Sequence, residues 1–346
     1  MEIKGIPSHQ KLISIIIVNY NGRKWLKDCL ESLEKQTYKK FEIILVDNAS
    51  SDNSVAYVKK HFPKVTIVQN KSNRGFAGGN NDGLKAAKGD YILLLNNDTW
   101  SPPDFLEDFI KAFDEYPKAG CVQSKMVLLK DTSKLDLVGS YWTNSSFLYY
   151  YGFGKDADLP QYNKAMPFFT NKGASVMIPR KVIDKIGLFD DDFWLYYEET
   201  DFCHRVWLAG YECWYWPKAI VHHAGGGTSI HFDNSLIQFH NFKNKLMSFL
   251  KNFESINLVT IVPIYIILNI GISFIWLFQG KTKHFFTLYQ SIWWNIVHFN
   301  KTMEKRINVQ KLRKKSDTQI FRITKKNPRF NYYYYLLKGQ VEKYQD

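Results

Sequence analysis

The chain has 346 residues, 45% of them hydrophobic and 23% charged, a composition that fits a folded protein and excludes a wholly disordered one. Its formal net charge of +13 is uneven, because residues 301–346 hold thirteen Lys or Arg against four Asp or Glu. Such a basic segment can bind nucleic acid or anionic lipid. The first residues, MEIKGIPSHQK, lack the apolar core of a secretory signal, so we expect the folded part to stay in the cytoplasm.

The four cysteines do not form a recognisable framework. Cys29, Cys121, Cys203 and Cys213 include no CxxC pair, and no Cys/His spacing indicates a zinc site. Cys203 and Cys213 could bridge in principle. The simpler expectation is that all four are free thiols in a reducing compartment.

Strands and helices alternate at short intervals in the first part of the chain. Apolar runs predict buried strands, and the segments between them show helical spacing. Expected strands cover 12–18, 41–47, 65–69 and 91–96, and expected helices cover 24–36, 52–62, 76–87 and 105–115. This alternation predicts a parallel α/β sheet. Short β-like runs follow in 120–150, and mixed α/β structure returns in 174–220.

The chain becomes more apolar after about residue 250. Residues 258–278 are 21 positions without a charge, and a helix of that length would measure ~31 Å, close to the hydrocarbon thickness of a bilayer. A second apolar and aromatic stretch covers 285–299. These stretches predict membrane attachment, through one or two spans or through helices lying in the membrane plane. The alternative is a hydrophobic subdomain packed on the rest of the chain.

Polar residues follow three of the expected strands, at the edge where open parallel sheets bind ligands. Asn19 ends the first strand, Asp47 ends the second, and Asn96-Asn97-Asp98 follows the fourth. Asp47 can accept hydrogen bonds from a base or a ribose, or it can serve the next turn and helix. Asp98 can hold Mg²⁺ or Mn²⁺, which prefer hard oxygen ligands. Asn-Asn-Asp is also good turn chemistry, so this motif alone is weak.

A glycine-rich segment precedes the third expected helix. Residues 73–80, NRGFAGGN, permit close backbone approach to a ligand and place a helix N-terminus where it favours an anion. The spacing is neither GxGxxG nor a Walker motif, which disfavours a dinucleotide cofactor or a P-loop. A glycine-rich turn without a ligand is the alternative.

Two later segments combine acidic, aromatic and histidine residues. In residues 189–201, FDDDFWLYYEETD, neighbouring carboxylates raise one another's pKa and the aromatic rings disfavour their charge further, which suits a general base. The same acids would also complement a helix N-terminus. His222 and His223 precede a glycine run, where a histidine can bind a metal, although a structural role is the commoner one.

Together these motifs resemble glycosyltransferase family 2 with the GT-A fold. The resemblance covers roughly residues 12–230 and rests on SIIIVNYNG, FEIILVDNASSD, NRGFAGGNNDGLKAAKGDYILLLNNDT, GASVMIPRKVIDKIGLFDDDFWLYYEETDFCHRV and HHAGGGTS. It implies a Rossmann-like, mixed and mostly parallel sheet flanked by helices within residues 1–250. The donor half would be about 12–100 and the acceptor and base half about 101–230. Residues 251–346 would form a C-terminal helical, membrane-associated extension.

The resemblance also implies the catalytic and donor-binding residues. Glu199 would be the base for the acceptor hydroxyl, with Glu198 beside it and Asp201 as a further acid that is structural or binds the acceptor. The donor-binding residues would be Asn19, Asp47, Asn73, Arg74, Gly75, Phe76, Asn80 and Asn97.

A divalent cation, Mn²⁺ or Mg²⁺, would be held by Asp98 together with His222 or His223, and His222 is preferred. Two positions depart from the family pattern. Asn96 replaces the first acid of the metal motif, and Glu199 stands where the family usually has Asp.

The expected function is that of an inverting, metal-dependent glycosyltransferase in cell-surface glycan synthesis. It would move a sugar from a nucleotide-diphosphate donor to a glycan or lipid-linked acceptor at the cytoplasmic face of a membrane. The nearest likeness, to the bacterial rhamnosyltransferase-like branch, favours dTDP-rhamnose, with UDP-sugars close behind. The alternative is a non-catalytic membrane scaffold that keeps the fold. A nucleic-acid partner is not expected, because the basic segment has no RRM, KH or zinc pattern and an apolar flank.

Overall fold

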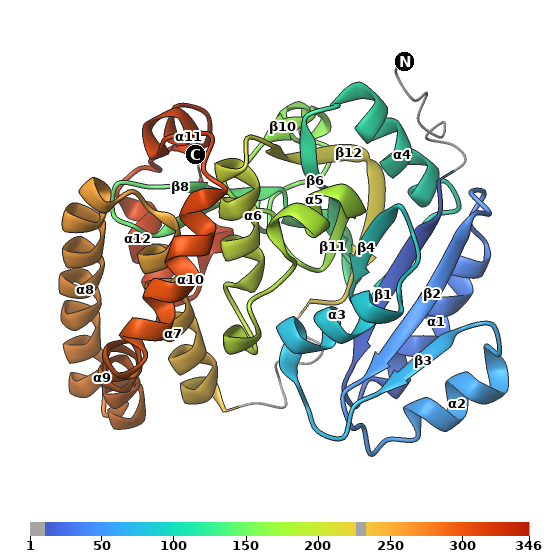
Figure 1. Ribbon diagram of the computed structural model, residues 1–346, viewed down its shortest axis with the longest axis horizontal. Helices are drawn as coiled ribbons and strands as arrows, with labels where there is room; N and C mark the ends of the chain where they lie inside the picture. Colours follow the sequence, from blue (N-terminus) through green and yellow to red (C-terminus); the bar gives the residue numbers. More distant parts are fainter. Residues whose placement is uncertain (1–10, 226–232, 346) are drawn as a thin grey trace.

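A mixed sheet of ten strands forms the centre of the computed structural model, which describes residues 11–225 and 233–345 (Figure 1). The strands are β1 (Ile13–Asn19), β2 (Phe41–Asp47), β3 (Thr66–Gln69), β4 (Tyr91–Leu95), β5 (Thr99–Trp100), β6 (Ala119–Leu128), β7 (Asp131–Leu137), β8 (Gly139–Trp142), β9 (Leu148–Tyr151), β10 (Met166–Pro167), β11 (Ser175–Pro179) and β12 (Glu212–His223). Eight strands of the large sheet follow the order β10-β12-β6-β11-β4-β1-β2-β3, and β5 and β7 join it by pairing with β12 and β6. β8 and β9 form a separate sheet of two strands.

Helices cover both faces of this sheet and extend beyond one of its ends (Figure 1). They are α1 (Arg23–Glu34), α2 (Ser54–His61), α3 (Gly75–Ala86), α4 (Phe105–Glu115), α5 (Arg180–Ile186), α6 (Glu198–Leu208), α7 (Asn234–Asn252), α8 (Ser255–Phe278), α9 (Thr282–Val297), α10 (Phe299–Lys311), α11 (Asp317–Thr324) and α12 (Asn331–Lys338). The eight elements expected in residues 12–115 are all present, with ends shifted by at most two residues.

The four strands β3, β2, β1 and β4 are parallel, as their apolar runs predict. Alternate side chains of β1 enter two different cores. Ile15 packs in the core that contains α1 and α4, whereas Ile16 packs in the core that contains α3. Burial on both faces explains why these strands are continuously apolar rather than alternating. Their carboxyl ends meet at one edge, which aligns Asn19 with Asp47.

The second half of the sheet turns back towards the same edge. β11 is antiparallel to β4 and β6, and β12 is parallel to β6. The end of β12 also pairs with β5, which sets His222 opposite Trp100 and His223 opposite Thr99. The mixed sheet thereby brings the last residues of β12 to the segment that follows β4.

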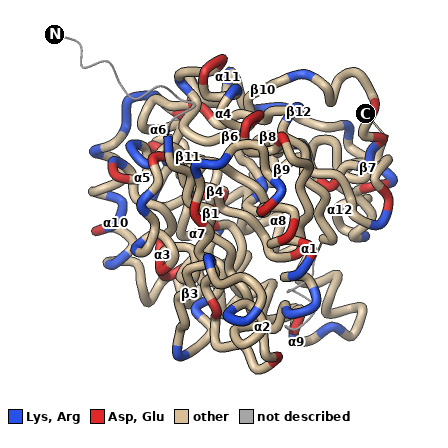
Figure 2. The backbone as a smooth tube through the Cα atoms, turned by 90° about the vertical axis from the view of Figure 1, so that its right-hand side faces the viewer, with Lys and Arg blue, Asp and Glu red and all other residues tan. Residues whose placement is uncertain are grey.

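Residues 251–345 pack against the rest of the molecule. α7 contacts α6, α8, α9 and α10, and α11 contacts α6 and β8. Lys305 pairs with Asp190 and Asp192, and the Tyr332 hydroxyl donates to the Leu148 carbonyl at 3.0 Å. The basic segment is therefore folded back and partly neutralised by acidic residues. In the view of Figure 2, basic and acidic segments are interspersed over many elements rather than gathered on one face.

Candidate active site

A cavity of about 300 Å³ opens beyond the carboxyl ends of β1 and β4. Eight of the residues expected to bind a donor, a metal or an acceptor proton contribute to its walls. They are Asn73, Gly75, Phe76, Asn97, Asp98, Glu198, Glu199 and His223. The sequence had assigned no site role to the other lining residues, which are Val18, Tyr20, Asn48, Asn96, Lys172, Gly173, Ala174, Trp194, Leu195 and Tyr196. Segments more than 120 residues apart in the chain thus share one hollow.

Asn19 and Asp47 lie behind this cavity and support its wall. The Asn97 amide donates to Asn19 Oδ1 at 2.8 Å, and the Asn19 amide donates to Asp47 Oδ1 at 3.2 Å. Asp47 also accepts from the Ser50 backbone NH at 3.0 Å. Both Asn19 and Asp47 are buried. In this geometry they hold the ends of β1, β2 and β4 together, and contact between Asp47 and a donor stays a prediction.

The glycine-rich segment forms another wall because it fits tightly against the loop before α6. Gly75 has φ +67, and a Cβ on it would lie 2.0 Å from the Trp194 carbonyl oxygen. The Trp194 indole NH donates to the Asn73 carbonyl at 3.1 Å. Only glycine combines this backbone conformation with this close approach.

Two residues of the same segment make contacts that are structural. Arg74 pairs with Asp82 at 2.7 Å at the surface, and the Asn80 amide donates to the Phe76 carbonyl at 2.9 Å within α3. Neither lines the cavity. A direct donor contact for Arg74 or Asn80 therefore stays a prediction, as it does for Asp47.

Asp98 begins a chain of alternating acidic and basic groups. His223 Nε2 lies 3.2 Å from Asp98 Oδ1, and His223 Nδ1 lies 2.6 Å from Asp136 Oδ2. Lys172 Nζ pairs with Asp136 at 2.6 Å. Burial lowers the pKa of His223, but its hydrogen bonds to Asp136 and Asp98 outweigh burial and leave that pKa raised. Burial raises the pKa of Asp136, but its hydrogen bond with His223 and the charge of Lys172 outweigh burial and hold that pKa below its ordinary value.

His223, rather than the preferred His222, is the histidine beside Asp98. Consecutive side chains of a strand point to opposite faces, so only one of the two can reach the cavity. His222 instead packs edge-on against Trp100, with ring centroids 4.9 Å apart. The preference for His222 is therefore corrected to His223.

Glu198 and Glu199 begin α6 after an unusual turn. Trp194, Tyr196 and Tyr197 have φ of 50, 65 and 70 degrees, a region that bulky residues seldom adopt. The side-chain amide of Asn244, on α7, donates to the carbonyls of Phe193, Leu195 and Tyr196 at 2.9, 2.9 and 2.6 Å. These bonds offset the cost of the strained backbone, so α7 fixes the position of the two acids.

The two glutamates at this helix start are poorly solvated. Burial raises the pKa of Glu199 from 4.5 to about 7 and raises the pKa of Glu198 well above its ordinary value. One oxygen of each, Oε2, is buried without a hydrogen-bond partner among the described residues. Buried polar atoms normally have partners, so these two are available to a bound ligand.

Asp201 differs from its two neighbours. It is fully buried and pairs with Arg205 at 3.0 Å and with Lys251 at 3.2 Å. These partners outweigh burial and lower its pKa. Asp201 does not line the cavity. It joins α6 to α7, and a catalytic role is not retained for it.

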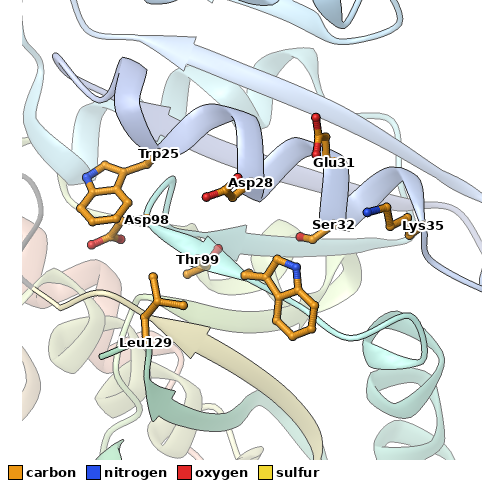
Figure 3. A pocket seen from close by; sticks show the side chains of 9 residues that line it. Trp25, Asp28, Glu31, Ser32, Lys35, Asp98, Thr99 and Leu129 are labelled. Atoms are coloured by element: carbon orange, nitrogen blue, oxygen red, sulfur yellow. The ribbon is translucent and has the colours of Figure 1, made fainter. Parts of the chain in front are cut away.

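A second hollow of about 180 Å³ lies on another side of Asp98 (Figure 3). The α1 side chains Trp25, Asp28 and Glu31 line it, together with Trp100 of β5. Asp98 therefore stands between the larger cavity and a smaller one walled by two indole rings.

A family model described as glycosyl transferase family 2 matches residues 14–187, which include the walls contributed by β1, β4 and α3. This chain belongs to that family. A relative named uncharacterized glycosyltransferase YwdF, from Bacillus subtilis, is 32% identical over 188 residues, 54% of this chain and 65% of its own length. The chain spans less than two thirds of the curated relatives it matches.

Solved structures share the fold of this member of family 2 at low sequence identity. GalNAc-T7, solved with UDP, GalNAc and Mn²⁺, aligns over 71% of this chain and 49% of its own, with a TM-score of 0.57 and 17% identity. The mannosyltransferase PcManGT of Pyrobaculum calidifontis, solved with GDP-Man and Mn²⁺, aligns over 72% and 66%, with a TM-score of 0.51 and 18% identity. The expected GT-A architecture is thus confirmed for this member of family 2.

Proposed function

We propose that this glycosyltransferase moves a sugar from a nucleotide-diphosphate donor to an acceptor hydroxyl with inversion, using a divalent cation and Glu199 as the base. The observation that carries the proposal is the shared cavity, in which Asp98 and His223 stand on one wall and Glu199 on another. A single-displacement transfer needs the metal-binding residues and the base within reach of the same sugar ring.

The residues at Asp98 fit a divalent cation. A carboxylate oxygen and an imidazole nitrogen converge to 3.2 Å, and Asp136 accepts from the opposite ring nitrogen of His223. A carboxylate behind a histidine is the arrangement that orients metal-binding imidazoles in proteins. When bound, Mn²⁺ or Mg²⁺ would neutralise charge on the leaving diphosphate. The Mn²⁺ in the complexes of GalNAc-T7 and PcManGT supports this assignment.

Glu199 has the properties of a general base near neutral pH. With a pKa of about 7, its carboxylate is populated at neutral pH yet still holds a proton strongly. It takes the proton of the acceptor hydroxyl while that oxygen bonds to the anomeric carbon. The bond from this carbon to the diphosphate breaks on the opposite face, and the configuration inverts. Burial and the neighbouring Glu199 charge raise the pKa of Glu198 well above its ordinary value, which favours the neutral form of this acid.

We propose a dTDP- or UDP-sugar as the donor and a glycan or lipid-linked saccharide as the acceptor. Rhamnose is the first candidate sugar, because of the likeness to the rhamnosyltransferase-like branch. The UDP bound by GalNAc-T7 supports a uridine nucleotide as the second candidate.

The helices α8 and α9 support attachment to a membrane, because polar side chains lie on their buried faces and apolar side chains lie on their exposed faces. α8 is long and apolar enough to cross a bilayer, with 22% of its most apolar window buried. Its buried face includes Asn269 and Ser273, and the buried face of α9 includes Ser291 and Asn295. Their outward faces carry exposed apolar side chains, which are Ile256, Val259, Ile267, Phe274 and Phe278 on α8 and Phe286, Trp293, Ile296 and Val297 on α9.

The buried polar groups of this hairpin make specific hydrogen bonds. Asn295 donates to the Lys243 carbonyl at 3.1 Å, and Ser291 donates to the Phe239 carbonyl at 3.0 Å, both on α7. Apolar side chains outside and hydrogen-bonded polar groups inside are typical of helices in lipid. We therefore propose that α8 and α9, at the edge of the molecule opposite β3 (Figure 1), contact acyl chains at the cytoplasmic face of the cell membrane.

Membrane attachment is tested by washing membranes from cells that express the full chain. We expect high salt to leave the protein in the pellet and detergent to release it, because the contact is apolar. The double substitution Ile267→Lys with Trp293→Lys should shift the protein to the soluble fraction, whereas Leu159→Lys, at an exposed position on the catalytic half, should not. Release of the wild type by salt alone would contradict insertion.

Transferase activity is tested with a panel of dTDP-, UDP- and GDP-sugars, scored by release of nucleoside diphosphate with and without membrane extract as acceptor source. We expect one donor class to be consumed with Mn²⁺ or Mg²⁺ and none in excess EDTA. Inverted stereochemistry in the product completes the test. No donor turnover under any condition would favour the non-catalytic scaffold.

A further inference from the structure

Three of the four cysteines meet in the core behind the active site. Cys121 lies on β6, Cys203 on α6 and Cys213 on β12, and all three are buried. Cys121 and Cys213 are register partners on adjacent parallel strands, and α6 places Cys203 next to both. Their three Sγ atoms lie within 4.8 Å of one another. The thiols therefore form a triangle, although they come from elements far apart in the sequence.

Two of the three sulfur atoms accept hydrogen bonds, as metal thiolates do, whereas the Cys213 thiol donates to the Cys203 carbonyl at 3.5 Å. The Asn171 backbone NH donates to Cys203 Sγ at 3.5 Å, and its side-chain amide donates to Cys121 Sγ at 3.6 Å. Hydrogen bonds of this kind stabilise negative charge on sulfur. The remaining side-chain atom, Asn171 Oδ1, is buried without a hydrogen-bond partner among the described residues. Three thiols that only fill space would leave that carbonyl oxygen unexplained.

We infer that Cys121, Cys203 and Cys213 bind one thiophilic d¹⁰ cation, Zn²⁺ or Cu⁺. In a tetrahedral zinc site with Zn–S bonds of ~2.3 Å, the sulfur atoms are about 3.8 Å apart. The observed triangle needs to contract by no more than about 1 Å to reach that spacing. Binding displaces the thiol protons to solvent, and three thiolates leave one position of a tetrahedral Zn²⁺ for a further ligand. Soft thiolates select these ions over Mg²⁺ and Mn²⁺.

The position of this thiol site gives it a structural role for the catalytic half. Cys203 is one helical turn after Glu199 on α6, and Asn171 precedes Lys172, the partner of Asp136. A bound cation would tie α6 to β6 and β12. Because metal-binding free energy adds to folding free energy, the metal-free protein should melt at a lower temperature.

The site is tested by elemental analysis of the full chain, purified in detergent without chelators and without an affinity tag that binds metal. We expect one zinc or copper ion per chain in the wild type and in Cys29→Ser, and almost none in Cys203→Ser. Cys29 is the matched control, because it is also buried but its Sγ lies 3.7 Å from Thr99 Oγ1 and is not part of the cysteine triangle. Incubation of metal-free wild type with Co²⁺ should produce thiolate charge-transfer absorption.

Each other outcome overturns the inference. Metal that is absent from the wild type, with no Co²⁺–thiolate absorption after loading, would show that the triangle is only packing. Metal retained equally by Cys203→Ser would place the ion elsewhere. A disulfide between two of the three cysteines, found by mass spectrometry of the alkylated protein, would show that they are not ligands. If Cys203→Ser fails to fold, release of metal from the wild type by a thiol-modifying reagent gives the same decision. None of these results bears on sugar transfer.

Discussion

Replacing Glu199 with Gln is expected to lower turnover by about 10²–10⁴-fold, the usual contribution of a general base. The amide keeps the size and position of the side chain at the start of α6 but cannot accept the acceptor proton. Nucleotide affinity should change little, because Asp98 and His223 stand on another wall of the cavity. Single-turnover rates and nucleotide titrations on the same preparation separate the two effects.

The pH dependence provides a second readout of the same residue. Because burial raises the pKa of Glu199 to about 7, the wild-type rate should rise as pH increases through 7 and level off above it. Glu199→Gln should lose this rise. Because burial raises this pKa from 4.5 to about 7, the Glu199 carboxyl group lowers the stability of the folded protein as pH rises between these two values, and the loss is complete at pH 8. The Gln variant should therefore not melt earlier than the wild type at pH 8.

Glu198→Gln is the matched control at the neighbouring position. Burial raises the pKa of Glu198 well above its ordinary value and favours its neutral form, which an amide resembles, so Glu198→Gln should retain most of the turnover. If Glu198→Gln were inactive and Glu199→Gln active, Glu198 would be the base instead of Glu199. Full activity in both variants would remove the base mechanism.

Replacing Asp98 with Asn is expected to lower turnover by about 10²–10³-fold and to raise the Mn²⁺ concentration needed for half-maximal rate. Metal stabilisation of the leaving group is worth several kcal/mol, and each 1.36 kcal/mol is tenfold in rate. Asp98 is the only acid in the Asn96-Asn97-Asp98 motif, so no carboxylate there can replace it. Asparagine preserves the shape while it removes the charge.

Asp136→Asn gives the graded comparison for this metal assignment. It leaves Asp98 and His223 in place and weakens the support behind His223, a change that typically costs 10–100-fold in metal affinity or activity. It also removes the charge partner of Lys172. Titration of the rate with Mn²⁺ should therefore rank wild type above Asp136→Asn and Asp136→Asn above Asp98→Asn. Identical Mn²⁺ curves for all three proteins would contradict a cation at His223 and Asp98.

Local patterns were sufficient for much of the fold. The runs ISIIIV and FEIILV are buried on both faces of a parallel sheet, so their hydrophobicity alone predicts strands with ends correct to within two residues. The glycine-rich segment was also predictable, because Gly75 has a positive φ and a close neighbour that only glycine permits.

Residues that meet through tertiary contacts could not be predicted. His222 and His223 differ only in the face of β12 from which they project, and the pairing of β12 with β5 and β6 decides which one reaches Asp98. Asp136 lies 87 residues before His223 and has no motif around it. The triangle of cysteines likewise depends on how α6 crosses two strands.

The basic segment shows the same limit. Its charge suggested an anionic partner, but Lys301 and Lys305 pair with Asp192. Asp192 belongs to residues 189–201, the acidic segment that was expected to contain the catalytic base. Charge counts do not distinguish an exposed cation from one with an intramolecular partner.

The proposed transfer requires one metal–diphosphate site that faces Glu199. A crystal structure with Mn²⁺ and the nucleoside diphosphate that most raises the melting temperature tests it directly. We predict an anomalous manganese peak bound to Asp98 and His223 Nε2, with the diphosphate in the cavity that Glu199 lines. A nucleotide bound in another cleft, or manganese that contacts neither residue, would contradict the account.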